Sequence, residues 1–160
     1  MNVAELEPGM PAPDFTLPST NGEITLSELI KTRSVVLAFY SEDDFPGCQE
    51  ELGFLRDEYS VFEYLEAEVL GISVGPIESQ QGLLSSLGGL PFPLVSDTSM
   101  SLGRAYGVLD DTGQRYRRAV YVVNRWGNIA VKIPLFQPGD QAEWMEMLQA
   151  LGLNVIGEDL

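Results

Sequence analysis

Two periodicities in the hydrophobic positions predict where the strands and helices of this chain lie. The continuous apolar runs at residues 35–40 and 69–74 are typical of strands that are buried on both faces of a sheet. Residues 48–66 form the longest predicted helix, because their apolar positions recur at spacings of four and three. The apolar face of that helix carries Cys48, Leu52, Leu55, Tyr59 and Phe62.

Shorter segments of the same two kinds fill the rest of the chain. Further strands are predicted at residues 15–17, 94–96, 118–124 and 128–133, and further helices at 27–31, 77–87, 99–106 and 141–151. Asn21-Gly22 marks a hairpin turn after the first strand. This order predicts an α/β fold, in which helices flank a central mixed sheet and an N-terminal extension precedes it. No repeat or linker interrupts residues 1–160, so we expect one domain.

The charge and composition of the chain exclude some classes of binding partner. The net charge of −15 argues against binding to nucleic acids and to anionic membrane surfaces. Such acidity is tolerated best where salt screens self-repulsion, so a salt-rich host and an ordinary acidic protein both fit. No apolar run approaches the ~20 residues that span a bilayer. Residues 1–13 lack the positive charge and apolar stretch of a signal peptide, and we therefore expect a cytoplasmic protein.

The chain has one cysteine and no histidine, which excludes many kinds of site. A single cysteine leaves no internal disulfide, no Cys-x-x-Cys pair and no cysteine-rich zinc site. Without histidine there is no Ser-His-Asp or Cys-His mechanism and no histidine metal site. No phosphate loop or dinucleotide fingerprint is present, so no cofactor or metal is predicted. The acidic run at residues 42–44 fits a solvated loop better than a divalent-cation site.

Cys48 lies where a nucleophile of an α/β fold is expected. It follows Tyr40, the end of a buried strand, after a seven-residue loop. Pro46 suits the first position of a helix, which makes Phe45 the predicted N-cap and puts Cys48 in the first turn. Unpaired N–H groups and the helix dipole favour a thiolate there.

Two interpretations of Cys48 stay open from these residues. Free cysteine is often a buried space-filling residue, and the apolar face of the helix fits that role. A reactive thiolate needs a cation against the nearby acidic residues. Residues 115–118 carry three arginines and enter a buried strand, so one of these arginines can point at the sheet end. Arg118 is also typical of a solvated strand residue.

Several stretches of the chain resemble the peroxiredoxins, and most closely their bacterioferritin-comigratory-protein (PrxQ-like) branch. Each stretch is short, and their order and separation carry the resemblance. They are residues 9–17 (GMPAPDFTL), 36–40 (VLAFY), 46–48 (PGC) with Glu51, 54–57 (FLRD), 70–74 (LGISV), 92–97 (FPLVSD), 106–108 (YGV) and 118–124 (RAVYVVN).

The resemblance implies a thioredoxin-like fold and a peroxidatic role for Cys48, whose thiolate would attack the O–O bond of a peroxide and become a sulfenic acid. It assigns Arg118 to stabilising the thiolate and Glu51 to positioning Arg118. The pocket residues that it implies are Tyr40, Ser41, Phe45, Pro46 and Gly47. The implied partners are a peroxide and an external thiol, either thioredoxin-like or of low molecular weight, and the chain would be a monomer or a homodimer.

Three positions depart from that family. Ser41 replaces a proline, Phe45 replaces a threonine or serine whose hydroxyl bonds the thiolate, and Gly53 stands where many PrxQ-like members have a resolving cysteine. Turnover would therefore need an outside thiol. Two functions remain: a one-cysteine thiol peroxidase, which Cys48, Glu51 and Arg118 favour, and a non-catalytic binding or redox-sensing module, which Ser41 and Phe45 favour.

Overall fold

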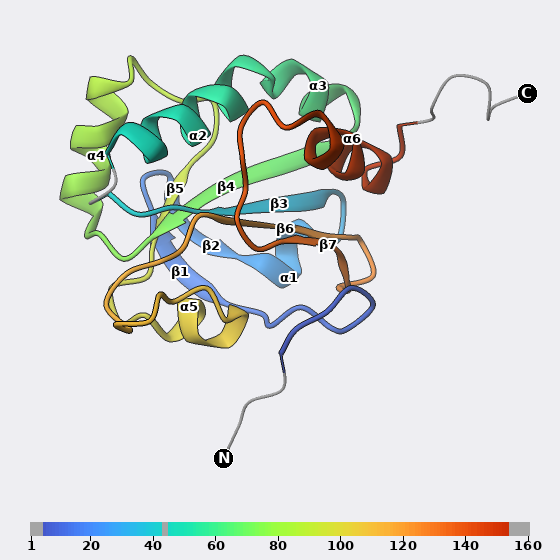
Figure 1. Cartoon of the computed structure of the whole chain (residues 1–160), viewed down its shortest axis with the longest axis horizontal. Helices are drawn as coiled ribbons and strands as arrows, with labels where there is room; N and C mark the ends of the chain where they lie inside the picture. The colour runs from blue at the N-terminus through green and yellow to red at the C-terminus, as the bar shows by residue number, and fades with distance from the viewer. Residues whose placement is uncertain (1–4, 43–44, 154–160) are drawn as a thin grey trace, which may run out of the picture.

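The computed structural model describes residues 5–42 and 45–153, and within them seven strands form one mixed sheet. The strand order is β2-β1-β5-β4-β3-β6-β7. Three parallel strands occupy its centre, β3 (Ser34–Phe39), β4 (Ala67–Ser73) and β5 (Leu94–Ser96). The antiparallel strands on either side are β1 (Thr16–Ser19), β2 (Gly22–Thr25), β6 (Ala119–Val123) and β7 (Ile129–Ile133). The predicted mixed sheet is confirmed (Figure 1).

The apolar run of β3 explains its central place. Val36 and Ala38 face one hydrophobic cluster, whereas Leu37 and Phe39 face another on the opposite side of the sheet. All four residues are fully buried. A strand that is apolar on both faces can only be accommodated between two layers, and this places the end of β3 inside the molecule.

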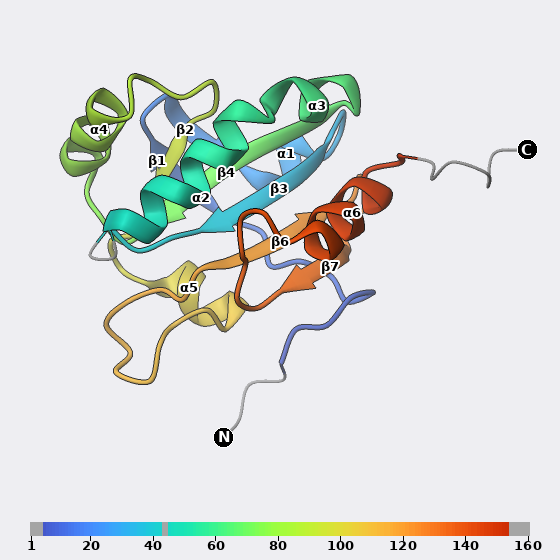
Figure 2. The same ribbon diagram turned by 45° about the horizontal axis from the view of Figure 1, so that its top comes forward.

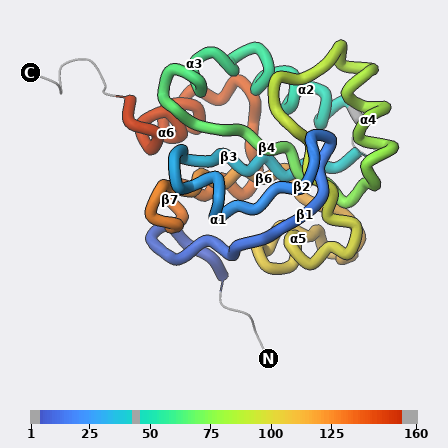
Figure 3. Tube along the Cα trace, turned by 180° about the vertical axis from the view of Figure 1, so that it is seen from behind, coloured from blue at the N-terminus to red at the C-terminus, as the bar shows by residue number. Residues whose placement is uncertain are grey.

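Helices cover both faces of the sheet (Figures 1 and 2). One face carries α2 (Phe45–Asp57), α3 (Tyr59–Tyr64), α4 (Ile77–Ser86) and α6 (Gln141–Ala150). The other carries α1 (Leu26–Leu29) and α5 (Ser101–Tyr106), which the view from behind shows nearest the N-terminal segment (Figure 3). In the part of the chain that the structure describes, no helix has the length and apolar character needed to cross a membrane.

The long helix predicted at residues 48–66 is in fact two helices. Four residues of its apolar face are buried and Tyr59 is half-buried, but the chain turns at Glu58 between α2 and α3. The turn lets Tyr59 donate its hydroxyl to Glu68 at 3.0 Å and lets Phe62 pack edge-on against Trp144 of α6. Helix α3 ends before Glu66, which adopts a positive φ of 58°. Contacts with the sheet and with α6 thus overrode the continuous helical periodicity.

The other predicted elements are present, and each of their ends lies within two residues of its predicted place. Strand β2 is the element that the prediction did not contain. It pairs with β1 across the predicted Asn21-Gly22 turn, where Gly22 takes a φ of 91°. The positive φ explains the glycine, because residues with a side chain rarely adopt it.

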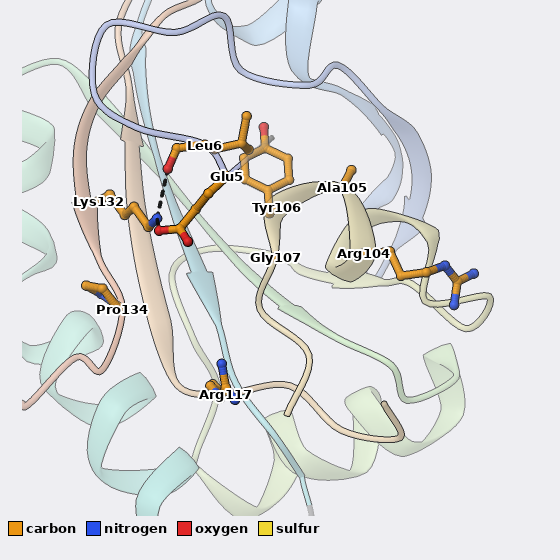
Figure 4. A pocket seen from close by; sticks show the side chains of 9 residues that line it. All are labelled: Glu5, Leu6, Arg104, Ala105, Tyr106, Gly107, Arg117, Lys132 and Pro134. Carbon is orange, nitrogen blue, oxygen red and sulfur yellow. Dashed lines mark hydrogen bonds and ion pairs between the residues drawn. The ribbon is translucent and has the colours of Figure 1, made fainter. Parts of the chain in front are cut away.

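The N-terminal extension lies along the first part of β7, the last strand of the sheet. The Gly9 N–H donates to the Ile129 carbonyl at 2.7 Å, and the Ile129 N–H donates to the Met10 carbonyl at 2.8 Å. From β7, Lys132 donates to the Glu5 carboxylate at 2.9 Å and to the Leu6 carbonyl at 2.8 Å (Figure 4). The Lys132 side chain is only 13% exposed, and its hydrogen bond and positive charge lower the pKa of Glu5. Lys132 therefore fastens the extension to the sheet.

We expect Lys132→Met to release this extension. The variant keeps an apolar stem of similar length but removes the donor to Glu5 and Leu6, so thermolysin should cut residues 5–12 of the native protein severalfold faster. Lys31→Met is the matched control, because Lys31 is exposed and pairs only with Glu28 among the described residues. Since the pKa of Glu5 is lowered, the wild-type attachment should also weaken as pH falls through that lowered value. Equal cleavage rates in both variants would contradict this assignment.

Four buried tyrosines should make the protein sensitive to alkali. Burial raises the pKa of Tyr121 to about 12 and also raises the pKa values of Tyr40, Tyr106 and Tyr116. A tyrosine in the unfolded chain ionises at pH ~10, below the raised pKa values of the folded protein. Between these two pH values the unfolded chain therefore binds fewer protons than the folded protein. Stability is therefore complete below pH ~10 and falls as pH rises above it. The tyrosinate absorbance at 295 nm that these four residues contribute should appear together with the loss of circular dichroism. Their ionisation in a protein that stays folded would contradict the prediction.

Candidate active site

A cavity of about 360 Å³ opens at the carboxyl end of β3, beside the first turn of α2. Its wall combines the thiol with charged side chains from several distant segments. The lining residues are Ser41, Cys48, Glu51, Asp110, Arg115, Tyr116, Arg117, Arg118, Leu135 and Gln137. Carboxyl ends of parallel strands are where α/β sheets bind ligands, and the predicted nucleophile lies at such an end.

Cys48 is the fourth residue of α2 and only 2% exposed. Its predicted place in the first turn is confirmed, but Phe45 is the first helical residue and not the predicted N-cap. The residue before a proline only disfavours the helical conformation, so the helix can begin one residue earlier than Pro46. The positive end of the helix dipole lies in this turn and favours a thiolate on Cys48.

Glu51 lies one turn after Cys48 and is fully buried on the same cavity. A carboxylate at such a position is costly unless cations or hydrogen-bond donors face it. The cavity wall supplies them, because Arg115, Arg117 and Arg118 line it as well. These three cations outnumber the two carboxylates on the wall, Glu51 and Asp110, in a chain whose net charge is −15.

Backbone hydrogen bonds hold the arginine segment, residues 115–118, on two sides. The Arg117 N–H donates to the Val108 carbonyl at 2.6 Å, and the Arg115 carbonyl accepts from Asp110 at 2.8 Å. On the far side, the Arg118 carbonyl accepts from the Phe136 N–H at 2.8 Å. Arg118 is half-buried, whereas Arg117 is exposed and pairs with Asp111 at 2.7 Å. The segment is thus fixed in place just before β6 begins.

The structure brings four of the predicted site residues together and leaves three outside the wall. Ser41, Cys48, Glu51 and Arg118 share the cavity. Tyr40 is buried in the same hydrophobic cluster as Cys48, Pro46 is exposed and Gly47 is buried, and none of these three is among the described residues that line the cavity. The side chain of Phe45 lies outside the described part of the structure.

Of the acidic residues at positions 42–44, the structure describes only Glu42. The Glu42 carboxylate accepts a hydrogen bond from the Ser73 hydroxyl at 3.0 Å, and Asp43 and Asp44 lie outside the described residues. In the described ranges, 5–42 and 45–153, no three acidic or cysteine side chains are grouped closely enough to hold a metal ion.

Several residues that line the cavity were not predicted from the sequence. Tyr116 and Arg117 directly precede Arg118, so their positions in the sequence already offered a signal. Leu135 and Gln137 follow β7 and reach the cavity because β7 pairs with β6 beside the arginine segment. That approach depends on strand order, and nothing in the local sequence indicates it.

The cavity therefore holds a sulfur nucleophile at a helix N-terminus and cations that can stabilise negative charge on it. The negative charges of Glu51 and Asp110 on the same wall disfavour a thiolate, so the arginines have to outweigh them. Such an arrangement suits attack by a thiolate on a small electrophile.

Comparisons with known proteins agree with this chemistry. The AhpC/TSA family matches residues 8–132. A putative peroxiredoxin bcp of Coxiella burnetii is 34% identical over 135 residues, which are 81% of this chain and 89% of that protein. The chloroplastic peroxiredoxin Q of Sedum lineare is 33% identical over 151 residues, or 92% of this chain and 81% of that one.

Comparison of the fold with solved structures indicates the same family. The crystal structure of peroxidoxin BcpB from Mycobacterium tuberculosis matches with a TM-score of 0.80 and 26% identity, over 92% of this chain and 97% of that chain. The sheet and its helices therefore form the thioredoxin-like fold of peroxiredoxins. Family match, relatives and fold together show that this chain belongs to the AhpC/TSA family of peroxiredoxins, which are thiol peroxidases.

Proposed function

We propose that the chain is a one-cysteine peroxidase that reduces hydrogen peroxide or an organic hydroperoxide through a sulfenic acid on Cys48. The observation that carries the proposal is the position of the only cysteine of the chain, on a cavity that it shares with Glu51 and three arginines. Membership of a peroxiredoxin family supports peroxide as the electrophile.

In the oxidative step, the Cys48 thiolate attacks the terminal oxygen of a hydroperoxide ROOH. A sulfur–oxygen bond forms while the O–O bond breaks, so Cys48 becomes S–OH and RO⁻ leaves. The leaving oxygen takes a proton and departs as ROH, or as water when the substrate is hydrogen peroxide. Arg118 would stabilise the thiolate before attack and the charge on the leaving oxygen during it, and Glu51 would orient Arg118.

The reductive half of the cycle needs an outside thiol, because the chain has no second cysteine. One external thiol attacks the sulfenic acid and releases water, which leaves a mixed disulfide on Cys48. A second thiol attacks the external sulfur, releases the oxidised reductant as a disulfide and restores the Cys48 thiolate. The reductant is thioredoxin-like or of low molecular weight. The cytoplasmic location, the single domain and the monomeric or homodimeric state stay predictions from the sequence.

Trapping the sulfenic acid tests this function. Reduced protein is mixed rapidly with hydrogen peroxide in the presence of dimedone, and the adduct is located by mass spectrometry. We expect one adduct on wild-type Cys48, none in Cys48→Ser, and peroxide turnover with dithiothreitol that disappears in that variant.

Two results would refute the proposal. Undiminished peroxide consumption by Cys48→Ser would assign the chemistry to another group. A wild type that forms no adduct and no oxidised Cys48 would favour a binding module, and one whose Cys48 is oxidised without turnover would favour a redox-sensing module; Ser41 and Phe45 favour these alternatives in the sequence.

A further inference from the structure

Asp97 is a buried acid that the proposed reaction does not use. It follows β5 directly and is fully buried. Its Oδ1 accepts from the Leu102 N–H at 3.2 Å, and its Oδ2 accepts from the Gly103 N–H at 2.9 Å and from the Tyr116 hydroxyl. Three donors from two segments thus converge on one carboxylate, which holds the start of α5 and Tyr116 together.

Tyr116 connects this carboxylate with the cavity. It lies within the arginine segment, lines the cavity that contains Cys48, and is only 4% exposed. Its ring packs edge-on against Phe39, with ring centroids 5.4 Å apart, where β3 ends before the loop to Cys48. A side chain that is buried, bonded at its tip and packed along its ring has one available position.

The same acid is also linked to the loop that carries Ser41, another residue of the cavity wall. The Asp97 N–H donates to the Ser73 carbonyl at 2.8 Å, and the Ser73 hydroxyl donates to Glu42 at 3.0 Å. Glu42 directly follows Ser41, which lines the cavity. A continuous chain of hydrogen bonds therefore runs from the loop after β3, through Ser73 and Asp97, to the arginine segment.

We propose that the hydrogen bond from Tyr116 to Asp97 is a positioning device, which holds the arginine segment at the distance from Cys48 that peroxide reduction requires. Tyr116 acts through Arg118 and its neighbours and is not itself a catalytic residue. The proposal rests on the peroxidase function for its consequence in turnover, whereas its effect on the Cys48 thiol does not need peroxide.

Tyr116→Phe tests the device, because it removes only the hydroxyl and keeps the ring. The readouts are the pH dependence of Cys48 alkylation by iodoacetamide and the rate of Cys48 oxidation by hydrogen peroxide. With the arginines free to move away, the thiol pKa should rise by about one unit and oxidation should slow about tenfold.

Tyr106→Phe is the matched control. The Tyr106 hydroxyl is also buried and donates to a single partner, the Pro13 carbonyl, at 2.7 Å, but Tyr106 lies outside the wall of the cavity that contains Cys48. Both variants lose one hydroxyl of the same kind, so both should lower the melting temperature. Only Tyr116→Phe should change the thiol pKa.

Gly103→Ala disturbs the same position without removing a polar group. A Cβ at Gly103 would overlap with the Tyr116 ring, so the ring and the segment that carries it have to shift. We expect a raised thiol pKa here too, even if Tyr116→Phe does not fold. Unchanged thiol pKa values in folded Tyr116→Phe and Gly103→Ala would overturn the proposal. A wild type that is inert to peroxide but shows these alkylation shifts would refute the peroxidase function and leave the positioning device standing.

Discussion

Replacing Arg118 with methionine is expected to slow the oxidation of Cys48 by hydrogen peroxide by ten- to about a hundredfold. Arg118 is half-buried on the cavity that Cys48 and Glu51 share, where its charge can stabilise the thiolate and the leaving oxygen. A charged hydrogen bond contributes ~1.5–3 kcal/mol, and each 1.36 kcal/mol changes a rate about tenfold. The thiol pKa of Cys48 should rise as well, because the variant removes a cation that favours the charged form. Stopped-flow oxidation and the pH dependence of alkylation measure the two effects.

Arg125→Met is the matched control for this change. Arg125 is exposed at the turn between β6 and β7, away from the cavity, so its loss removes the same charge from the chain without affecting Cys48. Arg118→Lys separates charge from geometry, because lysine keeps the cation but not the planar guanidinium. Equal rates in Arg118→Met, Arg125→Met and wild type would mean that Arg118 is a solvated strand residue and that Cys48 depends on the helix dipole and the other arginines.

Leu52→Ala is expected to lower the free energy of unfolding by ~2–5 kcal/mol, a large share of the ~5–15 kcal/mol that holds a typical domain together. Leu52 is one turn after Cys48 and fully buried between α2 and the sheet. Its closeness to the sheet is visible at Gly71 of β4, where a Cβ would lie 3.3 Å from Leu52 Cδ2. Truncation therefore leaves a cavity at the point where the Cys48 helix rests on the central strands. Urea denaturation measures the loss.

Tyr64→Ala is the control for Leu52→Ala. Tyr64 is 82% exposed at the end of α3, so its truncation should change the free energy of unfolding by less than ~0.5 kcal/mol. A cost for Leu52→Ala as small as that of Tyr64→Ala would show that α2 does not depend on this contact for its position.

The parts of the fold that the sequence predicted well are those in which the local pattern and the packing agree. The apolar run of β3 is buried on both faces of the sheet, as its residues require. The break at Glu58 was not predicted, because the apolar spacing continues from α2 to Phe62 and the turn follows from contacts with Glu68 and α6. The local periodicity of apolar residues does not indicate contacts with distant segments of the chain.

The residues of the candidate site likewise fall into those that the sequence predicted and those that it did not. Cys48 and Glu51 are one helical turn apart, so their common face followed from sequence, and Arg118 followed from the resemblance to peroxiredoxins. Asp97 and Tyr116 are 19 residues apart, and only the pairing of strands brings them into contact. The first residue of α2 was predicted one position late, because proline at the second helical position is less usual than at the first.

The fastening of the N-terminal extension by Lys132 has a consequence for how the protein behaves at high concentration. Strand β7 is the last strand of the sheet, and an uncovered last strand offers its backbone N–H and C=O groups to any other chain. Gly9 and Met10 occupy those groups at Ile129, and Lys132 keeps them there through Glu5 and Leu6. One charged side chain therefore protects the β7 edge of the sheet against intermolecular β-pairing. Acid neutralises Glu5, so we expect aggregation through this edge to begin at low pH.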